Sequence, residues 1–169
     1  DHGLDVGSAS WASRCADMAA DLGVDFVTER LRLAGGSNLE ARAREARYRV
    51  FDALLGSSDL LVLAHHSGDQ TESRLMHLLQ GRGLFGMPKI RRLGEGRLVR
   101  PLLEIDREAL AAYSRLHGLE WIEDPSNVDV SLDRNFLRQE VLPSLLGRFP
   151  DLPRRLAQLT EGAAATGQA

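Results

Sequence analysis

Apolar side chains recur at helical spacing in the first third of the chain. Residues 8–22 carry a stripe with steps of four, three and four residues, which predicts a helix that ends at Gly23. A second helix is predicted from about residue 38 to residue 55, because Ser37 and Glu40 form a capping box ahead of another apolar stripe. The first stripe consists of Trp11, Cys15, Met18 and Leu22.

Other apolar stretches predict strands. Residues 24–33 alternate unevenly between apolar and polar, and residues 60–64 form a continuous apolar run. The continuous run is typical of a parallel strand buried on both faces. We also expect an extended segment at residues 98–103, and a short strand or buried anchor at Trp121 and Ile122.

The rest of the pattern predicts helices and one long loop. Residues 81–97 are rich in glycine and arginine, which favours a loop. Helices are expected at residues 69–79, at 106–117 between the cap Asp106 and Gly118, at 133–146 with a kink at Pro143, and at 153–161. The order helix, strand, helix, strand, helix, followed by further helices, predicts an α/β fold.

Composition narrows the class of protein. The chain has 169 residues, 43% hydrophobic and 27% charged, which is ordinary globular usage. The lone Cys15 excludes an internal disulfide and a cysteine-rich metal site. No apolar run reaches the roughly 18 residues of a membrane span, so we expect no membrane partner. The single cysteine fits a reducing compartment, and we expect a cytoplasmic location. The chain starts at Asp1 without a methionine or signal peptide, and we expect both ends to be cut ends.

Charge is unevenly distributed. The net charge of −3 excludes a polycation that binds nucleic acid by bulk charge. Residues 82–100 nevertheless hold six positive side chains against the single acid Glu95. They are either a solvated loop or a local phosphate-contact patch. The six are Arg82, Lys89, Arg91, Arg92, Arg97 and Arg100.

Four titratable side chains follow the apolar run at residues 60–64, where parallel sheets bind ligands. They are His65, His66, Asp69 and Glu72. Asp69 and Glu72, three residues apart, share one face of the first helical turn and could hold Mg²⁺ or act as a base beside an attacking amine. Alternatively, Asp69 is an N-cap and Glu72 a first-turn acid. The block could also be a zinc site of a hydrolase, although only His2, His77 and His117 could add to it.

Arginines form further candidate sites. Arg134 and Arg138 share a helix face, which suits a phosphate or an acidic substrate. Arg42 and Arg47 lie on the helix predicted at residues 38–55. Residues 81–86 match the letters G-x-G-x-x-G, but they follow a helix instead of opening one, so we interpret them as a flexible loop that carries Arg82.

Several short stretches of the sequence match specific motifs of a known protein family. The blocks are Asp1-His-Gly-Leu4, Asn38-Leu-Glu-Ala-Arg-Ala-Arg-Glu-Ala-Arg-Tyr48, Ala64-His-His66, Asp69-Gln-Thr-Glu72, Gly81-Arg-Gly-Leu-Phe-Gly-Met87, Arg100-Pro-Leu-Leu103, Trp121-Ile-Glu-Asp-Pro-Ser-Asn127, Asp129, Asp133-Arg-Asn-Phe-Leu-Arg138 and Val141-Leu-Pro143. In content and order they resemble bacterial tRNA(Ile)-lysidine synthetases of the PP-loop ATPase group. The resemblance covers roughly residues 1–150.

The resemblance implies an activity and a set of roles. Members of this family use ATP and Mg²⁺ to adenylate carbon 2 of the wobble cytidine in a CAU-anticodon tRNA(Ile), and free lysine then displaces AMP. It also suggests a possible homodimer. By motif position we expect catalytic Asp69, Glu72 and His65; substrate- and tRNA-binding Arg42, Arg47, Arg82, Arg134 and Arg138; ATP-binding His2 and His66; and Asp69 as a Mg²⁺ ligand.

Two departures from the family pattern affect these expectations. Gly68 stands where the family usually has an aspartate, and the family's Ser-Gly-Gly-x-Asp-Ser pyrophosphate loop is absent. We therefore expect a Rossmann-like parallel sheet that lacks its first strands, with a partial α/β domain at residues 1–104 and a helical segment at 105–169. We expect the chain alone to fold poorly and to turn over little ATP.

Two other readings compete with this one. Another PP-loop tRNA-modifying enzyme is possible, but sulfur transfer needs cysteine pairs and only Cys15 is present. A non-catalytic RNA-binding fragment would use the arginine faces alone, and its tRNA binding would depend on salt but not on ATP.

Overall fold

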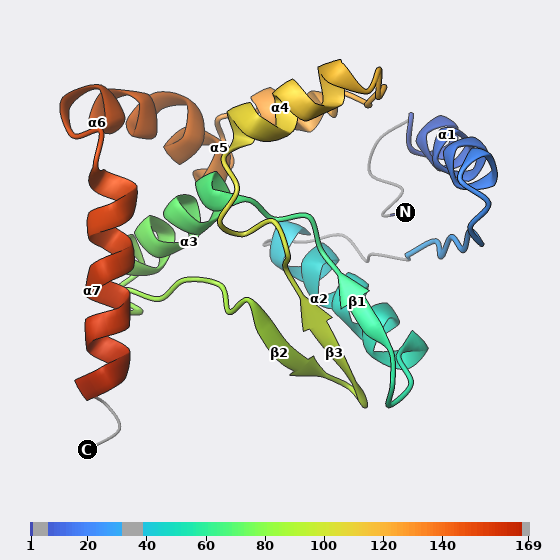
Figure 1. Ribbon diagram of the computed structural model, residues 1–169, viewed down its shortest axis with the longest axis horizontal. Helices are drawn as coiled ribbons and strands as arrows, with labels where there is room; N and C mark the ends of the chain where they lie inside the picture. Colours follow the sequence, from blue (N-terminus) through green and yellow to red (C-terminus); the bar gives the residue numbers. More distant parts are fainter. Residues whose placement is uncertain (2–6, 32–38, 167–169) are drawn as a thin grey trace. The chain divides into compact units, whose positions relative to one another are not determined.

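The chain combines helices with three short strands that lie between α2 and α4 in sequence (Figure 1), which confirms the α/β class. The computed structural model describes residues 1, 7–31 and 39–166. Its elements are α1 (Ser8–Asp21), α2 (Leu39–Leu54), β1 (Leu60–Val62), α3 (Ser67–Leu79), β2 (Ile90–Leu93), β3 (Gly96–Val99), α4 (Arg107–Leu116), α5 (Asp133–Phe136), α6 (Leu142–Arg148) and α7 (Leu152–Thr166), with a 3-10 turn at Pro125–Val128 and a π-helical turn at Leu137–Val141.

The three strands form one sheet in the order β1-β3-β2. β1 and β3 run parallel, because Arg97 N–H donates to the Asp59 carbonyl at 3.1 Å and Leu63 N–H donates to the Val99 carbonyl at 3.0 Å. β2 and β3 are joined as a hairpin (Figure 1), with Gly94 in its turn at φ +55°. The parallel pairing confirms the prediction, whereas the loop expected at residues 81–97 is wrong in its second half.

Three further predictions about strands are wrong. Residues 24–31 form neither strand nor helix, and the rest of that predicted strand lies outside the described residues. β1 is not buried on both faces, since Leu60 and Val62 are more than half exposed at the edge of the described sheet. Trp121 is neither a strand nor a buried anchor: it is exposed, and its indole N–H donates to Glu123 at 2.8 Å.

The predicted helices are confirmed, with differences at their ends. Gly23 follows α1 at φ +65°, where only glycine avoids a steric penalty, but the stripe of α1 is not buried. Ser37 lies outside the described residues, so the capping box of α2 is not tested. Asp106 occupies the N-cap of α4 without capping it, because its carboxylate accepts from the Ser67 hydroxyl at 2.6 Å. The break expected at Pro143 is the π-helical turn that ends two residues earlier.

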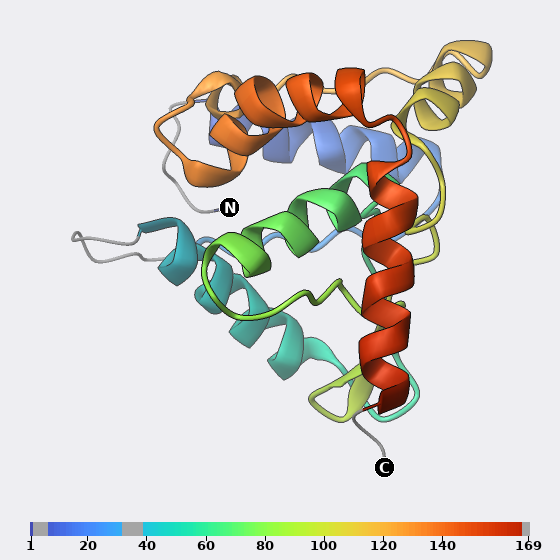
Figure 2. The same cartoon turned by 90° about the vertical axis from the view of Figure 1, so that its left-hand side faces the viewer.

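The chain divides into two compact units. One comprises Asp1–Leu61 and Arg92–Leu98, and the other comprises Val62–Arg91 and Val99–Ala169. The second unit contains the principal apolar cluster, formed by Leu75, Leu137, Leu142 and Leu156. Full burial of one such side chain contributes roughly 1.5–3 kcal/mol. The cluster therefore fixes α3 against the α5–α6 region and α7, and Figure 2 shows α3 and α7 side by side.

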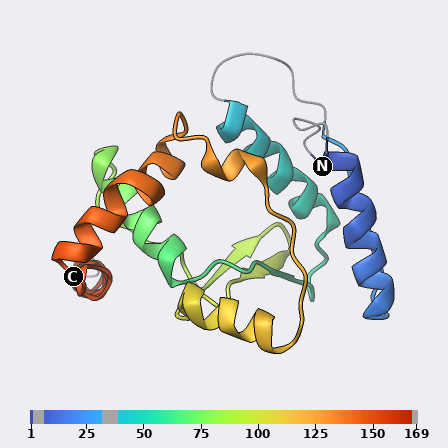
Figure 3. The same cartoon turned by 90° about the horizontal axis from the view of Figure 1, so that it is seen from above.

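A long connection also belongs to this second unit. Residues 117–132 lead from α4 to α5 and include the 3-10 turn, as Figure 3 shows.

None of the helices in the described part of the chain is both long and apolar enough to cross a membrane. The expected domain boundary between residues 104 and 105 is a single cut in the sequence, whereas each compact unit combines two separate stretches of the chain. The expected boundary stays a prediction.

Candidate functional site

The candidate site begins at the first turn of α3. His66 is the N-cap: its Nδ1 accepts from Gly68 N–H at 3.1 Å, and its own N–H donates to Asp69 Oδ2 at 2.9 Å. Asp69 is therefore the third helical residue of a capping box and not the N-cap that one reading of the sequence expects. The cap fixes Asp69 and Glu72 on one face of α3.

Two arginines from the α5 region meet these two carboxylates. Arg134 Nε donates to Glu72 Oε2 at 2.7 Å, and its Nη2 donates to Asp69 Oδ1 at 3.0 Å. Arg138 Nε donates to Glu72 Oε1 at 2.6 Å, its Nη2 donates to Glu72 Oε2 at 2.9 Å, and that nitrogen also reaches Asp69 Oδ1 at 3.5 Å. We call these four residues the Arg–carboxylate network.

The network is electrically balanced and partly buried. The side chain of Glu72 is 4% exposed and that of Asp69 is 12% exposed, whereas both arginine side chains are about one-third exposed. The hydrogen bond to Glu72 raises the pKa of Arg138, and the charges of Glu72 and Asp69 add to this against the opposing effect of desolvation. Charge-assisted bonds of this length are among the strong hydrogen bonds in proteins, so they fix the geometry of the four side chains.

Local contacts hold the two arginines in place. Asn135, between them in sequence, is buried and donates to the carbonyls of Ser126 and Asp129 at 2.8 and 3.0 Å. Gln139 donates to the Asn127 carbonyl at 2.6 Å. The 3-10 turn is thereby attached to the helix that presents the arginines. This gives a physical reason for Asn135 in the block at residues 133–138.

A cleft of about 770 Å³ opens beside the network. Its polar wall includes Asp69, Glu72 and Arg138, together with the N-terminal residues of α4, while α6 and Pro153 supply apolar surface. A cleft that combines charges of both signs with apolar surface suits a small amphipathic ligand, because the polar groups orient it and the apolar wall excludes water.

A second set of contacts organises the segment after α3. The Gln70 amide donates to the Met87 carbonyl at 2.8 Å and accepts from Met87 N–H at 2.6 Å. Gly86 allows this close approach, since a Cβ at that position would lie 2.7 Å from Gln70 Oε1 and would displace the amide. Sequence reasoning missed Gln70 as a positioning residue, although its place inside a recognised block was a signal that could have found it.

Arg100 was likewise missed as a site residue, although it opens one of the recognised blocks and belongs to the basic patch. It is 2% exposed, and its guanidinium donates to His65 Nδ1 at 3.3 Å and to the Pro88 carbonyl at 2.7 Å. Arg100 therefore orients His65 and does not belong to an exposed charged surface. The pattern of apolar and polar positions gives no indication that Arg100 is buried.

The other predicted site residues are dispersed. Arg82 is exposed just after α3, in the same unit as the network. Arg42 and Arg47 lie on α2 in the other unit, where partial desolvation and then the charge of Arg44 lower the pKa of Arg47. His2 lies outside the described residues. The structure thus brings together Asp69, Glu72, Arg134 and Arg138, with His66 beside Asp69 at the helix N-cap.

The carboxylates do not fit a resident metal as they stand. Asp69 Oδ1 and both Glu72 oxygens accept from arginines, and Asp69 Oδ2 accepts from the His66 backbone. Within the described part of the chain, no three His, Cys, Asp or Glu side chains gather as metal ligands. Mg²⁺ needs oxygen ligands that are not already neutralised. The zinc alternative likewise has no ligand cluster among those residues.

Gly68 has a structural reason in this chain. A Cβ at position 68 would lie 2.8 Å from His66 Cε1 and 3.0 Å from His66 Nδ1. A larger residue at this position would therefore force the His66 ring away from the N-cap. The absence of a side chain at Gly68 therefore allows the His66 ring to occupy the N-cap position.

Sequence comparisons identify relatives of this chain. The family described as "PP-loop domain" matches residues 1–145. A tRNA(Ile)-lysidine synthase of Pseudomonas fluorescens (strain Pf0-1) is 43% identical over 160 residues, which cover 93% of this chain and 36% of that protein. The protein of the same name from Alkalilimnicola ehrlichii is 48% identical over 162 residues, with 93% and 36% covered. That from Legionella pneumophila (strain Lens) is 39% identical over 160 residues, with 93% and 37% covered. The chain spans little more than one-third of these relatives' length.

Proposed function

Because this chain belongs to the PP-loop domain family, we propose that it forms the catalytic part of a tRNA(Ile)-lysidine synthase. The proposed reaction joins free lysine to carbon 2 of the wobble cytidine in a CAU-anticodon tRNA(Ile). The oxygen on carbon 2 attacks the α-phosphate of ATP and pyrophosphate leaves; the lysine amine then loses a proton and forms the C–N bond while the C–O bond breaks and AMP leaves with that oxygen. Relatives at 39–48% identity that carry this name support the proposal.

The Arg–carboxylate network beside the cleft is the observation that carries this proposal. Free lysine has a carboxylate and two amines, so its binding site needs cations and carboxylates within one side chain's reach. Arg138 supplies a cation, while Asp69 and Glu72 supply acceptors for an ammonium group on the same cleft wall. Exchange of an Arg–carboxylate contact for a contact with lysine keeps every charge paired, which limits the desolvation penalty.

Proton transfer is the second task of the site. The attacking amine must lose a proton, and a carboxylate within hydrogen-bond reach can accept it. Glu72 and Asp69 are the proposed acceptors, since they line the cleft. His65, held by Arg100, is the proposed alternative catalytic group. Arg134 and Arg138 are proposed to neutralise phosphate or carboxylate charge during the exchange.

ATP supplies the adenylyl group when it is bound. His2 and His66 are the residues proposed to bind it. His66 caps α3, so a contact with ATP would add to this structural use. The described carboxylates do not fit Mg²⁺ unless the arginines move, so we assign no step to the metal through Asp69. Arg42, Arg47 and Arg82 are the proposed tRNA contacts. A cytoplasmic location and a homodimer stay predictions.

Lysine transfer in a longer protein tests the proposed function. We would replace the matching 160 residues of the Pseudomonas fluorescens relative with this chain and supply labelled lysine, ATP, Mg²⁺ and tRNA(Ile) transcript. We expect ATP-dependent label on the tRNA, and no label on a transcript whose wobble cytidine is uridine. A folded chimera that binds the tRNA but transfers no lysine would overturn the proposal and favour the RNA-binding alternative.

A further inference from the structure

Two arginines face each other across the β2–β3 hairpin. The strands are separated by the two turn residues 94 and 95, and Arg100 N–H donates to the Lys89 carbonyl at 2.8 Å. This register places Arg92 on β2 directly opposite Arg97 on β3, and both are exposed. Like charges in directly opposite positions of an antiparallel pair oppose each other, so their placement calls for a function.

The backbone beneath this pair is tightly held. A Cβ on Gly94 would lie 2.8 Å from Asp52 Oδ1, and a Cβ on Gly96 would lie 2.7 Å from the Asp59 carbonyl oxygen. Arg97 N–H also donates to that carbonyl at 3.1 Å. The hairpin turn is therefore packed closely against the end of α2 and the turn that follows it. A rigid base reduces the entropy lost when side chains bind a ligand.

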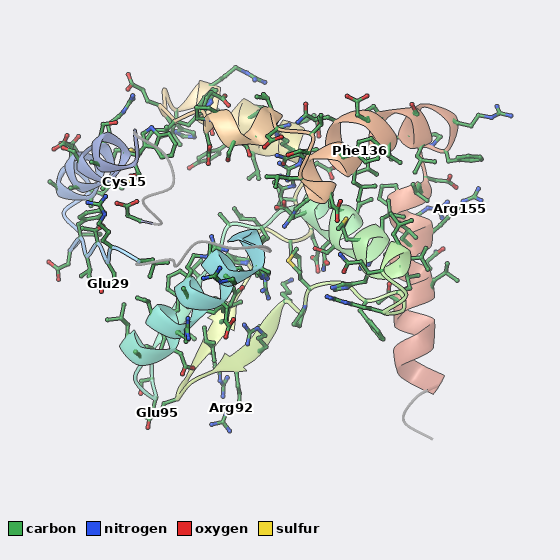
Figure 4. All side chains as sticks on the ribbon, turned by 180° about the vertical axis from the view of Figure 1, so that it is seen from behind. Cys15, Glu29, Arg92, Glu95, Phe136 and Arg155 are labelled. Atoms are coloured by element: carbon green, nitrogen blue, oxygen red, sulfur yellow. The ribbon has the colours of Figure 1, made fainter. Side chains whose placement is uncertain are left out.

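A small concavity lies between the two arginines and the neighbouring turn. It has a volume of about 200 Å³ and is lined by Ser57, Arg92, Glu95, Gly96 and Arg97, all in one unit. Its charged groups are two cations and one carboxylate, which leaves one net positive charge. Figure 4 shows Arg92 on the hairpin and Glu95 at its turn, with their side chains directed away from the ribbon.

We infer that Arg92 and Arg97 form a contact for the phosphate backbone of RNA, separate from the Arg–carboxylate network. Guanidinium groups bind phosphate oxygens in a bidentate manner, and two of them on neighbouring strands suit a single phosphate. The net positive charge of the pair complements that phosphate, and the Ser57 hydroxyl can donate to another oxygen. The inference rests on the proposed tRNA substrate and assigns it a further contact surface.

Salt-dependent binding of labelled tRNA(Ile) tests this inference. The chimera that tests the proposed function, which contains this chain in full, would be compared with its R92Q/R97Q variant by fluorescence anisotropy over a range of salt concentrations. Loss of two phosphate contacts should reduce the slope of log K against log salt by about 1.4–1.8 and weaken binding by about tenfold at low salt. Far-UV circular dichroism would verify that both proteins have the same helix content.

A matched variant separates a local contact from net charge. R154Q/R155Q removes the same two charges from α7, where both arginines are exposed and paired with Asp151; Figure 4 marks Arg155 there. We expect this variant to bind tRNA within about twofold of the unchanged chimera. Equal losses in both double variants, or no loss in R92Q/R97Q, would overturn the inference.

Two further outcomes distinguish the possible sources of phosphate and the two proposals. Inorganic phosphate at matched ionic strength should displace tRNA no better than chloride; selective displacement that requires both arginines would assign a free-phosphate site and overturn the RNA contact. Intact lysine transfer by R92Q/R97Q, with unchanged tRNA affinity, would overturn this inference alone. Absence of salt-dependent tRNA binding by the unchanged chimera would overturn both the contact and tRNA as the partner.

Discussion

Replacement of Glu72 by glutamine tests the Arg–carboxylate network. Glu72 is 4% exposed and accepts three hydrogen bonds of 2.6–2.9 Å from Arg134 and Arg138. Glu72→Gln replaces one acceptor oxygen with an amide that donates, and leaves two cations facing the single charge of Asp69. Breaking a fully buried ion pair costs about 3–5 kcal/mol; because the arginines are one-third exposed, we expect about 2–3 kcal/mol here.

Urea denaturation followed by far-UV circular dichroism measures this cost. Glu140→Gln is the matched control, because Glu140 is an exposed acid on the helical turn that carries Arg138 and the charge change is identical. We expect the control to change the free energy of unfolding by no more than about 0.5 kcal/mol. If Glu72→Gln destabilises the chain no more than Glu140→Gln does, the network does not hold α3 to the α5 region.

Three smaller perturbations test other parts of the account. Gly68→Ala should displace the histidine N-cap of α3 and lower the free energy of unfolding by about 1 kcal/mol, measured by urea denaturation; an unchanged value would contradict the close approach of the ring. Gln70→Ala removes both hydrogen bonds to Met87, so trypsin should cleave residues 81–88 faster than in the unchanged chain, and equal rates would argue against the clamp. The hydrogen bond from Arg155, with smaller contributions from the charges of Arg155 and Arg154, lowers the pKa of Asp151 in the folded chain. Its stabilisation is therefore present above the unfolded value of about 3.9 and is lost as pH falls through the folded value. Asp151→Asn should therefore differ from the unchanged chain at neutral pH and match it in acid; a difference independent of pH would refute that cause.

The helices were predictable because their signals are local. An apolar stripe and a C-terminal glycine each depend on residues within one or two helical turns. The structure contains the helix ends expected at Gly23 and Gly118, and both glycines have positive φ. The parallel strand at Leu60–Val62 was also predictable from its apolar run. Its exposure was not, because burial of a strand depends on which segments cover its two faces.

The hairpin was missed because arginine and glycine concealed its alternation. Ile90–Leu93 and Gly96–Val99 have exposed arginines on one face, and composition alone suggested a solvated loop. The same limit applies to Trp121, whose apolar ring suggested burial, whereas its indole N–H is used in a local bond with Glu123. Both partners lie within a few residues of each other in these segments, but cross-strand packing and local polar bonds, which hydrophobic periodicity does not record, determine their structure.

The candidate site was predictable in membership but not in arrangement. Asp69, Glu72, Arg134 and Arg138 were each singled out, yet the carboxylates and arginines were given separate tasks. The structure joins them across more than sixty residues of sequence. Helical spacing shows which residues share a face, but the partner face depends on tertiary packing. The combined network is why the carboxylates do not stand ready as metal ligands.

The mass of the wobble nucleoside tests the central claim most directly. A CAU-anticodon tRNA(Ile) would be incubated with the chimeric protein, lysine, ATP and Mg²⁺, digested to nucleosides and analysed by mass spectrometry. The account predicts a new nucleoside whose mass equals that of cytidine plus lysine minus one water, formed only when ATP and lysine are both present. An unchanged cytidine after incubation with folded protein that binds both ATP and the tRNA would contradict it.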